Sequence, residues 1–235
     1  MNVVITGASK GIGHETVKSL ARAGVLKIIG ISRNYKQLCE LKESCSQLSM
    51  TEFIPIQYDF QQITISEPKL AGLVKQHMNH IDILINNAGA LVSKPFEQIS
   101  ADDINRMFTV NYIAPALLIK TLLPLLKAGQ AHVVNITSMG GFQGSMKFKG
   151  LSHYSASKAA LASLTECLAE EFKLEGMVFN ALALGAVQTE MLAEAFPNYK
   201  APVSAEQMGE FIANFSLNAK TFFNGKIIPI SISIP

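Results

Sequence analysis

The feature that most constrains this chain is its alternation of short apolar, β-branched runs with longer helical patterns. The runs are continuous rather than alternating with polar residues, which is typical of strands covered on both faces. Helical crossovers between such strands produce a parallel sheet. We therefore predict an α/β fold: a doubly wound parallel sheet of about seven strands with helices on both faces. The predicted strands span residues 3–6, 26–32, 53–58, 83–86, 132–137, 177–183 and 226–232.

Between the strands lie helical patterns, with no linker, repeat or low-complexity segment, so residues 1–235 are predicted to form a single domain. Two irregular segments near 139–151 and 185–203 each follow a strand and are rich in Gly, Met, Phe and Lys. Ligands of open α/β sheets bind outside the carboxyl ends of the strands. These segments are therefore predicted to wall a substrate site. The predicted helices span 12–23, 35–49, 68–79, 101–127, 152–174 and 205–218.

Composition excludes several classes of partner. A net charge of +2 is too small to indicate a nucleic acid or an anionic membrane surface as partner. No apolar run reaches the ~18 residues that a membrane helix needs, and the opening residues lack the features of a signal peptide. Cys39, Cys45 and Cys167 have neither disulfide-type nor metal-type spacing. We expect a cytoplasmic protein with reduced thiols and no metal.

A glycine-rich turn joins the first strand to the first helix. Gly7, Gly11 and Gly13 allow tight turning and close backbone approach. A strand, such a turn and a helix direct backbone N–H groups and the positive helix end at a phosphate. The turn predicts a dinucleotide site, although a glycine turn that binds no nucleotide stays possible. The same turn contains Ser9, Lys10 and Ile12.

The end of the second strand favours NADP over NAD. NAD-type folds place an acid about 20 residues beyond the glycines to hold the ribose hydroxyls. Here Ser32, Arg33 and Asn34 occupy that place, with no acid among them. Arg33 can bind a 2′-phosphate through charge-assisted hydrogen bonds, and Lys10 can add a second positive charge. Taken singly, each cation also fits a solvated surface.

Tyr154 and Lys158 are four residues apart and therefore share one face of a helix, which Ser152 is positioned to cap. A tyrosine with a pKa of about 10 is a poor acid at neutral pH. An ammonium about 4 Å away would lower that pKa by up to about three units before burial opposes it. The pair can thus build a phenol that gives a proton to a forming alkoxide.

Further motifs lie between the glycine turn and Tyr154. Asn87, Ala88 and Gly89 follow the strand at 83–86, and Asn111 lies within a helical pattern. Ser138 closes the strand at 132–137. In this order and over nearly the whole chain, the motifs resemble the short-chain dehydrogenase/reductase family. Among its branches the chain looks most like 3-oxoacyl-(acyl-carrier-protein) reductases.

The resemblance implies a Rossmann-type fold and a role for each motif. Ser138 polarises a substrate carbonyl, with Thr137 as the alternative if the register differs by one, and Tyr154 protonates the carbonyl oxygen. Lys158 holds the nicotinamide ribose and tunes Tyr154, while Asn111 holds a water of the proton relay. The family's cofactor site further implies that Asp59 lies against the adenine, where a strand-end turn former is the other reading, and that Asn87, Ala88 and Gly89 line the cofactor.

The chain departs from the family pattern at Leu184, which stands where a proline is usual. A proline would fix φ and remove an N–H, so the path of the following loop is open at this point. Gly185, Val187 and Thr189 keep the pattern, so cofactor contacts by the Val187 backbone and the Thr189 hydroxyl are expected. Five side chains suggest an apolar pocket wall: Phe142, Met146, Phe148, Met191 and Phe196.

The implied activity is that of an NADP(H)-dependent oxidoreductase, which transfers a hydride between the nicotinamide and a carbonyl or alcohol substrate, with a 3-oxoacyl thioester as one candidate. A catalytically silent NADP-binding regulatory protein of the same fold is the alternative. A sugar-nucleotide epimerase or dehydratase would need a larger substrate domain after the catalytic helix. Family members commonly pair long helices, so a homodimer or homotetramer is expected.

Overall fold

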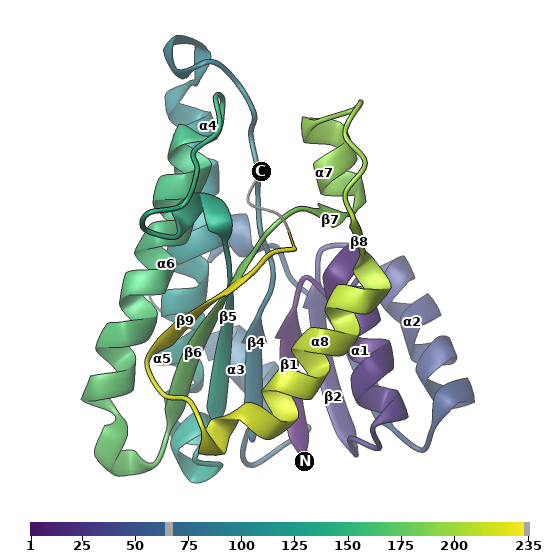
Figure 1. Cartoon of the computed structure of the whole chain (residues 1–235). Helices are drawn as coiled ribbons and strands as arrows, with labels where there is room; N and C mark the ends of the chain where they lie inside the picture. The colour runs from purple at the N-terminus through teal and green to yellow at the C-terminus, as the bar shows by residue number, and fades with distance from the viewer. Residues whose placement is uncertain (64–67, 233–235) are drawn as a thin grey trace.

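The computed structural model describes residues 1–63 and 68–232, which fold around one parallel sheet (Figure 1). The strand order in this sheet is β3-β2-β1-β4-β5-β6-β9. The predicted Rossmann-type α/β fold is confirmed, because all seven predicted runs form strands of this sheet. The strands are β1 (Asn2–Thr6), β2 (Lys27–Ser32), β3 (Glu52–Gln57), β4 (Ile83–Asn86), β5 (His132–Ser138), β6 (Val178–Leu184) and β9 (Lys226–Ile230).

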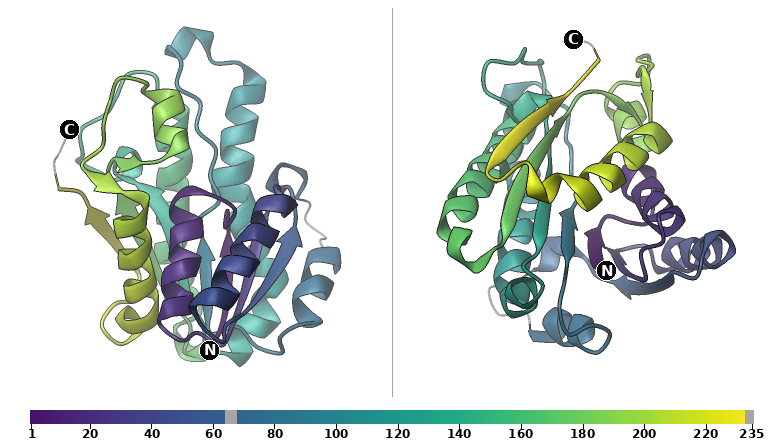
Figure 2. Two further views of the ribbon diagram at one scale, coloured as in Figure 1. Left: turned by 90° about the vertical axis from the view of Figure 1, so that its right-hand side faces the viewer. Right: turned by 60° about the horizontal axis from the view of Figure 1, so that its bottom comes forward.

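Helices cover both faces of the sheet (Figure 2). One face packs against α1, α2 and α8, and the other against α3, α5 and α6. A two-stranded sheet of β7 (Val187–Gln188) and β8 (Val203–Ser204) lies beyond β6. The helices are α1 (Gly11–Arg22), α2 (Tyr35–Leu48), α3 (Pro68–Lys75), α4 (Ala101–Phe108), α5 (Ala114–Ala128), α6 (Ser152–Glu171), α7 (Glu190–Ala195) and α8 (Ala205–Asn218).

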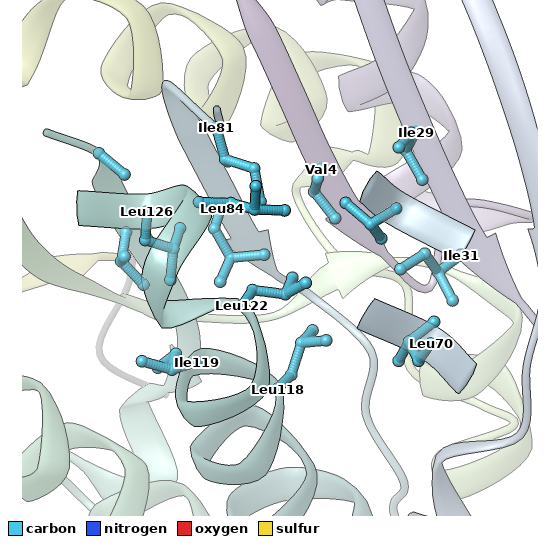
Figure 3. Packing of buried hydrophobic residues seen from close by; sticks show 14 of the residues in the cluster. Val4, Ile29, Ile31, Leu70, Ile81, Leu84, Leu118, Ile119, Leu122 and Leu126 are labelled. Carbon is cyan, nitrogen blue, oxygen red and sulfur yellow. The ribbon is translucent and has the colours of Figure 1, made fainter. Parts of the chain in front are cut away.

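The core explains why the strands are apolar without interruption. Val4 and Leu84 from neighbouring strands meet Leu118 and Leu122 of α5, and all four are fully buried (Figure 3). Each such side chain contributes about 1.5–3 kcal/mol when it leaves water. The helical stretch Ala101–Ala128 is long and apolar enough to cross a membrane, with mean hydropathy 1.5, but half of that window is buried inside the protein. It therefore has the character of a core helix.

The strand order reverses between β1 and β4, and this switch point is where open α/β sheets bind ligands. The turn from β1 into α1 lies at this crevice. Two helices, α4 and α7, rise beyond the carboxyl ends of the strands (Figure 1). The fold therefore gathers the predicted motifs at one edge of the sheet.

Three local expectations are wrong. Ser152 is the first residue of α6 and does not cap it, because the N-cap position belongs to Leu151 and no side chain accepts there. The segment 185–203 is not wholly irregular, since it contains α7, whose N-terminus Thr189 caps by accepting from Leu192 N at 3.2 Å. The predicted helix 101–127 is interrupted by a π-helical turn, η3 (Thr109–Ile113).

Candidate active site

A cavity of about 490 Å³ opens at the carboxyl edge of the sheet. It brings together nearly all of the residues that the sequence assigned to cofactor and catalysis. Of the predicted set, Asn34 and Asn111 do not line it. The predicted residues that do are Gly7, Ser9, Lys10, Gly11, Ile12, Gly13, Ser32, Arg33, Asp59, Asn87, Ala88, Gly89, Ser138, Tyr154, Lys158, Gly185, Val187 and Thr189.

The glycine turn is fastened to the end of β4. The Thr6 hydroxyl oxygen accepts from the N–H groups of Asn87 and Ala88, at 3.0 and 2.9 Å. The Asn87 amide donates back to the carbonyls of Thr6 and Gly7, at 3.0 and 3.2 Å. A Cβ on Gly13 would lie 2.3 Å from Gly7 O and 2.4 Å from Asn87 Nδ2. Only glycine fits there, so the turn and the strand end form one rigid cradle.

The end of the cavity beside β2 carries positive charge, and no carboxylate stands at the end of that strand. Arg33 is exposed and lines the cavity, and its guanidinium has no ion pair within the described part of the chain. The hydroxyl oxygens of Ser9 and Ser32 lie 2.7 Å apart, which joins the glycine turn to β2. These groups fit a ribose phosphate, because an unpaired guanidinium and two hydroxyls are good partners for phosphate oxygens.

Two neighbours of this end have other partners than expected. Asn34 lies outside the cavity and caps α2, where its side chain accepts from Gln37 N at 3.2 Å. The Lys10 ammonium pairs with the Glu190 carboxylate at the start of α7. Asp59 lines the cavity and also caps the short turn η1 (Phe60–Gln62), so both readings of this residue fit the structure.

Ser138, at the end of β5, is the serine that faces Tyr154. Its hydroxyl oxygen accepts from Gly140 N at 3.2 Å and hydrogen-bonds with the Tyr154 hydroxyl. Thr137 instead donates to Leu182 O at 3.2 Å in the interior. Burial raises the pKa of Tyr154, and the Ser138 hydrogen bond opposes that rise. The predicted register, with Ser138 rather than Thr137 beside the tyrosine, therefore matches the geometry.

Lys158 is buried, and its ammonium donates to Ile136 O at 2.7 Å. Burial lowers the pKa of Lys158 to about 8. Burial, which the sequence argument set against the effect of the ammonium, dominates at Tyr154 and raises its pKa. A Cβ on Gly89 would lie 3.5 Å from Asn111 Oδ1 and 3.7 Å from Lys158 Nζ. Gly89 thus lies beside both the lysine ammonium and the Asn111 amide.

Asn111 lies at the centre of the π-helical turn η3, and such turns are often found at functional sites. Its Oδ1 accepts from Ala90 N and its Nδ2 donates to Ala90 O, both at 2.8 Å. The same Nδ2 donates to Ser157 Oγ at 2.9 Å, and Ser157 in turn donates to Tyr154 O. Asn111 therefore ties the segment after β4 to the turn of α6 that carries Tyr154.

The geometry agrees with the comparisons. A family model described as short chain dehydrogenase matches residues 1–200. The chain belongs to the short-chain dehydrogenase/reductase family. Its relatives include Protein FixR of Bradyrhizobium diazoefficiens, 31% identical over 97% of this chain and 84% of that protein. Another is L-xylulose reductase of Caenorhabditis elegans, 34% identical over 80% of this chain and 72% of that protein.

Solved structures of short-chain dehydrogenases have the same fold. The Pseudomonas aeruginosa RhlG active-site complex with NADP superposes with a TM-score of 0.86. It is 25% identical, and the match covers 98% of this chain and 94% of that one. The present chain is thus an oxidoreductase of the short-chain family, with a nucleotide cradle of the family's type.

For this short-chain dehydrogenase, the sequence pattern predicted only part of the apolar wall of the cavity. Phe148, Met191 and Phe196 line the cavity as predicted, but Phe142 and Met146 do not. Leu151, Leu192 and Tyr199 are further lining residues that the pattern did not single out. Ser157 was missed as well. A signal existed for α7, because Thr189 followed by Glu190 is a typical helix start.

Proposed function

We propose that this protein is an NADP(H)-dependent carbonyl reductase or alcohol dehydrogenase. The observation that carries the proposal is one cavity shared by the hydroxyls of Ser138 and Tyr154, the Lys158 ammonium and the glycine cradle. A reduced nicotinamide bound there supplies the hydride. The protein supplies position, a proton and electrostatic stabilisation.

The preference for NADP over NAD rests on Arg33. The guanidinium lies at the cavity without a carboxylate partner among the residues that the structure describes, and no acid ends β2. An acid there would repel a 2′-phosphate, whereas a guanidinium binds it through paired charge-assisted hydrogen bonds. A related structure at 25% identity was solved with NADP. Lys10 would add to this site after exchanging its Glu190 partner for phosphate.

The proposed proton path begins at Tyr154. Its hydroxyl already meets that of Ser138, so a carbonyl oxygen placed between them receives two hydrogen bonds. Tyr154 then donates its proton to that oxygen as negative charge develops. Lys158 uses one of its three N–H donors on Ile136 O, which leaves two that would bind the ribose hydroxyls of the cofactor. Asn111 holds the backbone around this group in place.

The substrate is proposed to be an apolar carbonyl compound, and a 3-oxoacyl thioester is one candidate. The wall beyond Ser138 and Tyr154 consists mainly of apolar and aromatic side chains. A polyol would leave its hydroxyls without partners along such a wall, at a cost for each unpaired group. The wall residues are Met139, Phe148, Leu151, Leu184, Met191, Leu192, Phe196 and Tyr199. Action as one catalytic domain over residues 1–235, a cytoplasmic location and a homo-oligomeric state remain predictions.

The first test is NADPH consumption against a panel of carbonyls that includes an acetoacetyl thioester, an aromatic ketone and a ketose. We expect turnover of the apolar members and a fall in kcat of roughly 100-fold or more in Tyr154→Phe, with NADPH binding retained. Tight NADPH binding without turnover across the panel would favour the silent regulatory protein instead. Faster turnover of the ketose would contradict the apolar substrate class.

The second test is Arg33→Asp, with dissociation constants measured by the fluorescence of bound NADPH and NADH. Losing a charge-assisted contact and adding a repulsive charge should weaken NADPH binding by roughly 30-fold or more. NADH has no 2′-phosphate, so its binding should change little. Equal losses for both cofactors would reject the role of Arg33.

A further inference from the structure

The loop between β5 and α6 contains a lysine, Lys147, whose ammonium group donates hydrogen bonds to backbone carbonyls close to Ser138. The Lys147 ammonium donates to Gly140 O at 2.8 Å, to Phe142 O at 2.7 Å and to Ser145 Oγ at 2.8 Å. These three bonds use all three of its N–H donors. Within the described residues it has no carboxylate partner. Its positive charge is therefore directed into the turn that follows the catalytic strand.

Ser145 links the Lys147 ammonium to the backbone at Met139. Its hydroxyl donates to Met139 O and also lies 2.8 Å from Phe142 O. A hydroxyl has only one proton, and the two lone pairs of Phe142 O already accept from Lys147 Nζ at 2.7 Å and from Ser145 N at 3.4 Å. The Ser145 proton therefore serves Met139 O. This carbonyl belongs to the same peptide unit as Gly140 N–H.

The Met139–Gly140 peptide is the one that touches the catalytic hydroxyl. Gly140 N donates to Ser138 Oγ, and the Ser138 hydroxyl meets that of Tyr154. A continuous chain of hydrogen bonds thus runs from the Lys147 ammonium through Ser145 and one peptide to Ser138. Such chains polarise one another, and a hydroxyl whose oxygen accepts a polarised N–H is a better donor.

Close packing transmits the position of this turn to the catalytic helix. A Cβ on Gly140 would lie 2.7 Å from Ser155 Oγ. A Cβ on Gly141 would lie 2.6 Å from Ala159 N and 3.0 Å from Lys158 Cβ. The turn therefore lies directly on the part of α6 that carries the catalytic groups, with no room to shift toward it.

We propose that Lys147 is a positioning residue, which acts through Ser145 and the Met139–Gly140 peptide to orient the Ser138 hydroxyl and strengthen it as a donor to the substrate oxygen. The catalytic part of this inference rests on the proposed reductase function. The structural part, the hydrogen-bond chain itself, does not. The two parts can therefore be tested separately.

The structural part is tested by the Gly140 amide resonance in protein labelled with nitrogen-15 glycine. Lys147→Met and Ser145→Ala should each shift this resonance. Lys149→Met is the matched control, since Lys149 is an exposed lysine of the same loop outside this chain of hydrogen bonds, and it should leave the resonance in place. An unmoved Gly140 resonance in both Lys147→Met and Ser145→Ala overturns the proposal, whether or not any carbonyl is turned over.

The catalytic part is tested by kcat and by the dissociation constant of NADPH. Lys147→Met should lower kcat roughly tenfold while NADPH binding stays within about twofold of the wild type. Lys147→Arg should restore most of the loss, because it keeps a cation that donates to carbonyls. The double variant Ser145→Ala/Lys147→Met should be no slower than the worse single variant. Additive losses, or a kcat no lower than that of Lys149→Met, would overturn the catalytic part. Ser145→Ala decides the question if Lys147→Met does not fold.

Discussion

The two ends of β5 carry two buried polar clusters with opposite characters. At its start, His132 is 1% exposed, and both ring nitrogens are bonded. Its Nδ1 lies 3.0 Å from Ser216 O and its Nε2 lies 3.1 Å from the Asn180 amide. A carbonyl can only accept and the Asn180 Nδ2 can only donate, so one neutral tautomer satisfies both contacts.

At the other end of β5, the polar groups do not use all of their hydrogen-bonding capacity within the described protein. The Lys158 ammonium has one protein acceptor, Ile136 O, among the described residues, although it carries three N–H donors. Tyr154 and Ser138 meet each other at the cavity. A buried group with every bond made serves the fold, whereas one with donors to spare is set for a ligand. The difference separates structure from chemistry along a single strand.

The largest expected effect on activity comes from replacing Lys158, at the end of β5 that faces the cavity. Lys158→Met should lower kcat by roughly 100-fold or more and weaken NADPH binding. It should leave the free energy of unfolding unchanged or raise it, because a buried charge is replaced by an apolar side chain. Urea unfolding and steady-state kinetics measure the two effects. A large loss of stability with activity retained would show instead that Lys158 serves the fold and not catalysis.

At the start of β5, His132 should make the stability of the protein, but not its catalytic rate, depend on pH. Burial lowers the pKa of His132 from 6.5 to about 4 in the folded protein. Above pH 6.5 both states hold a neutral ring, so there is no cost. Below it the unfolded chain takes up a proton that the folded protein refuses. Stability therefore falls as the pH falls from 6.5 to about 4, by ~3 kcal/mol in total.

This is measured by urea unfolding of the wild type and His132→Asn across that pH range. The variant keeps a hydrogen-bonding side chain that does not titrate, so the difference between the two curves isolates the histidine. We expect kcat of His132→Asn to match the wild type near neutral pH. Parallel stability curves would show that the ring does not resist protonation.

The smallest expected effect compares two serines at helix starts. Ser152 begins α6 without capping it, while Ser204 caps α8 and accepts from Gln207 N at 3.1 Å. Ser204→Ala should cost about 1 kcal/mol of stability. Ser152→Ala should change it by less than about 0.5 kcal/mol. Thermal unfolding of the pair tests this, and equal losses would mean that Ser152 acts as a cap in solution.

The sequence predicted the sheet well, because each strand is encoded by a local apolar run. The glycine turn after the first strand is also a local pattern, so a nucleotide site was predicted from it, whereas the catalytic residues were assigned through the resemblance to the short-chain family. The hydrogen-bond partner of Lys158 could not be predicted from the sequence. Ile136 O is a backbone group that a side chain meets only after folding, and no residue type marks it.

Two further misses have similar causes. The helix α7 has only six residues, too few for a hydrophobic period to show. The turn around Asn111 looked like ordinary helix, because a π-helical bulge depends on tertiary hydrogen bonds to Ala90 and Ser157 rather than on propensity. The net direction of the Tyr154 pKa could not be predicted, because it depends on burial, which a sequence does not show and which raises this pKa.

The fastening of the glycine turn to β4 bears on the speed of cofactor capture. The Asn87 amide donates to the carbonyls of the turn, and the Gly13 backbone packs closely against both Gly7 O and that amide. Because the glycine turn and the end of β4 are already ordered in the free protein, the entropic cost of ordering them when a nucleotide binds is small. Association should then follow a single exponential whose observed rate rises linearly with nucleotide concentration, without the plateau that a slow rearrangement imposes. Differences in affinity among nucleotides would then appear in how long each one stays bound.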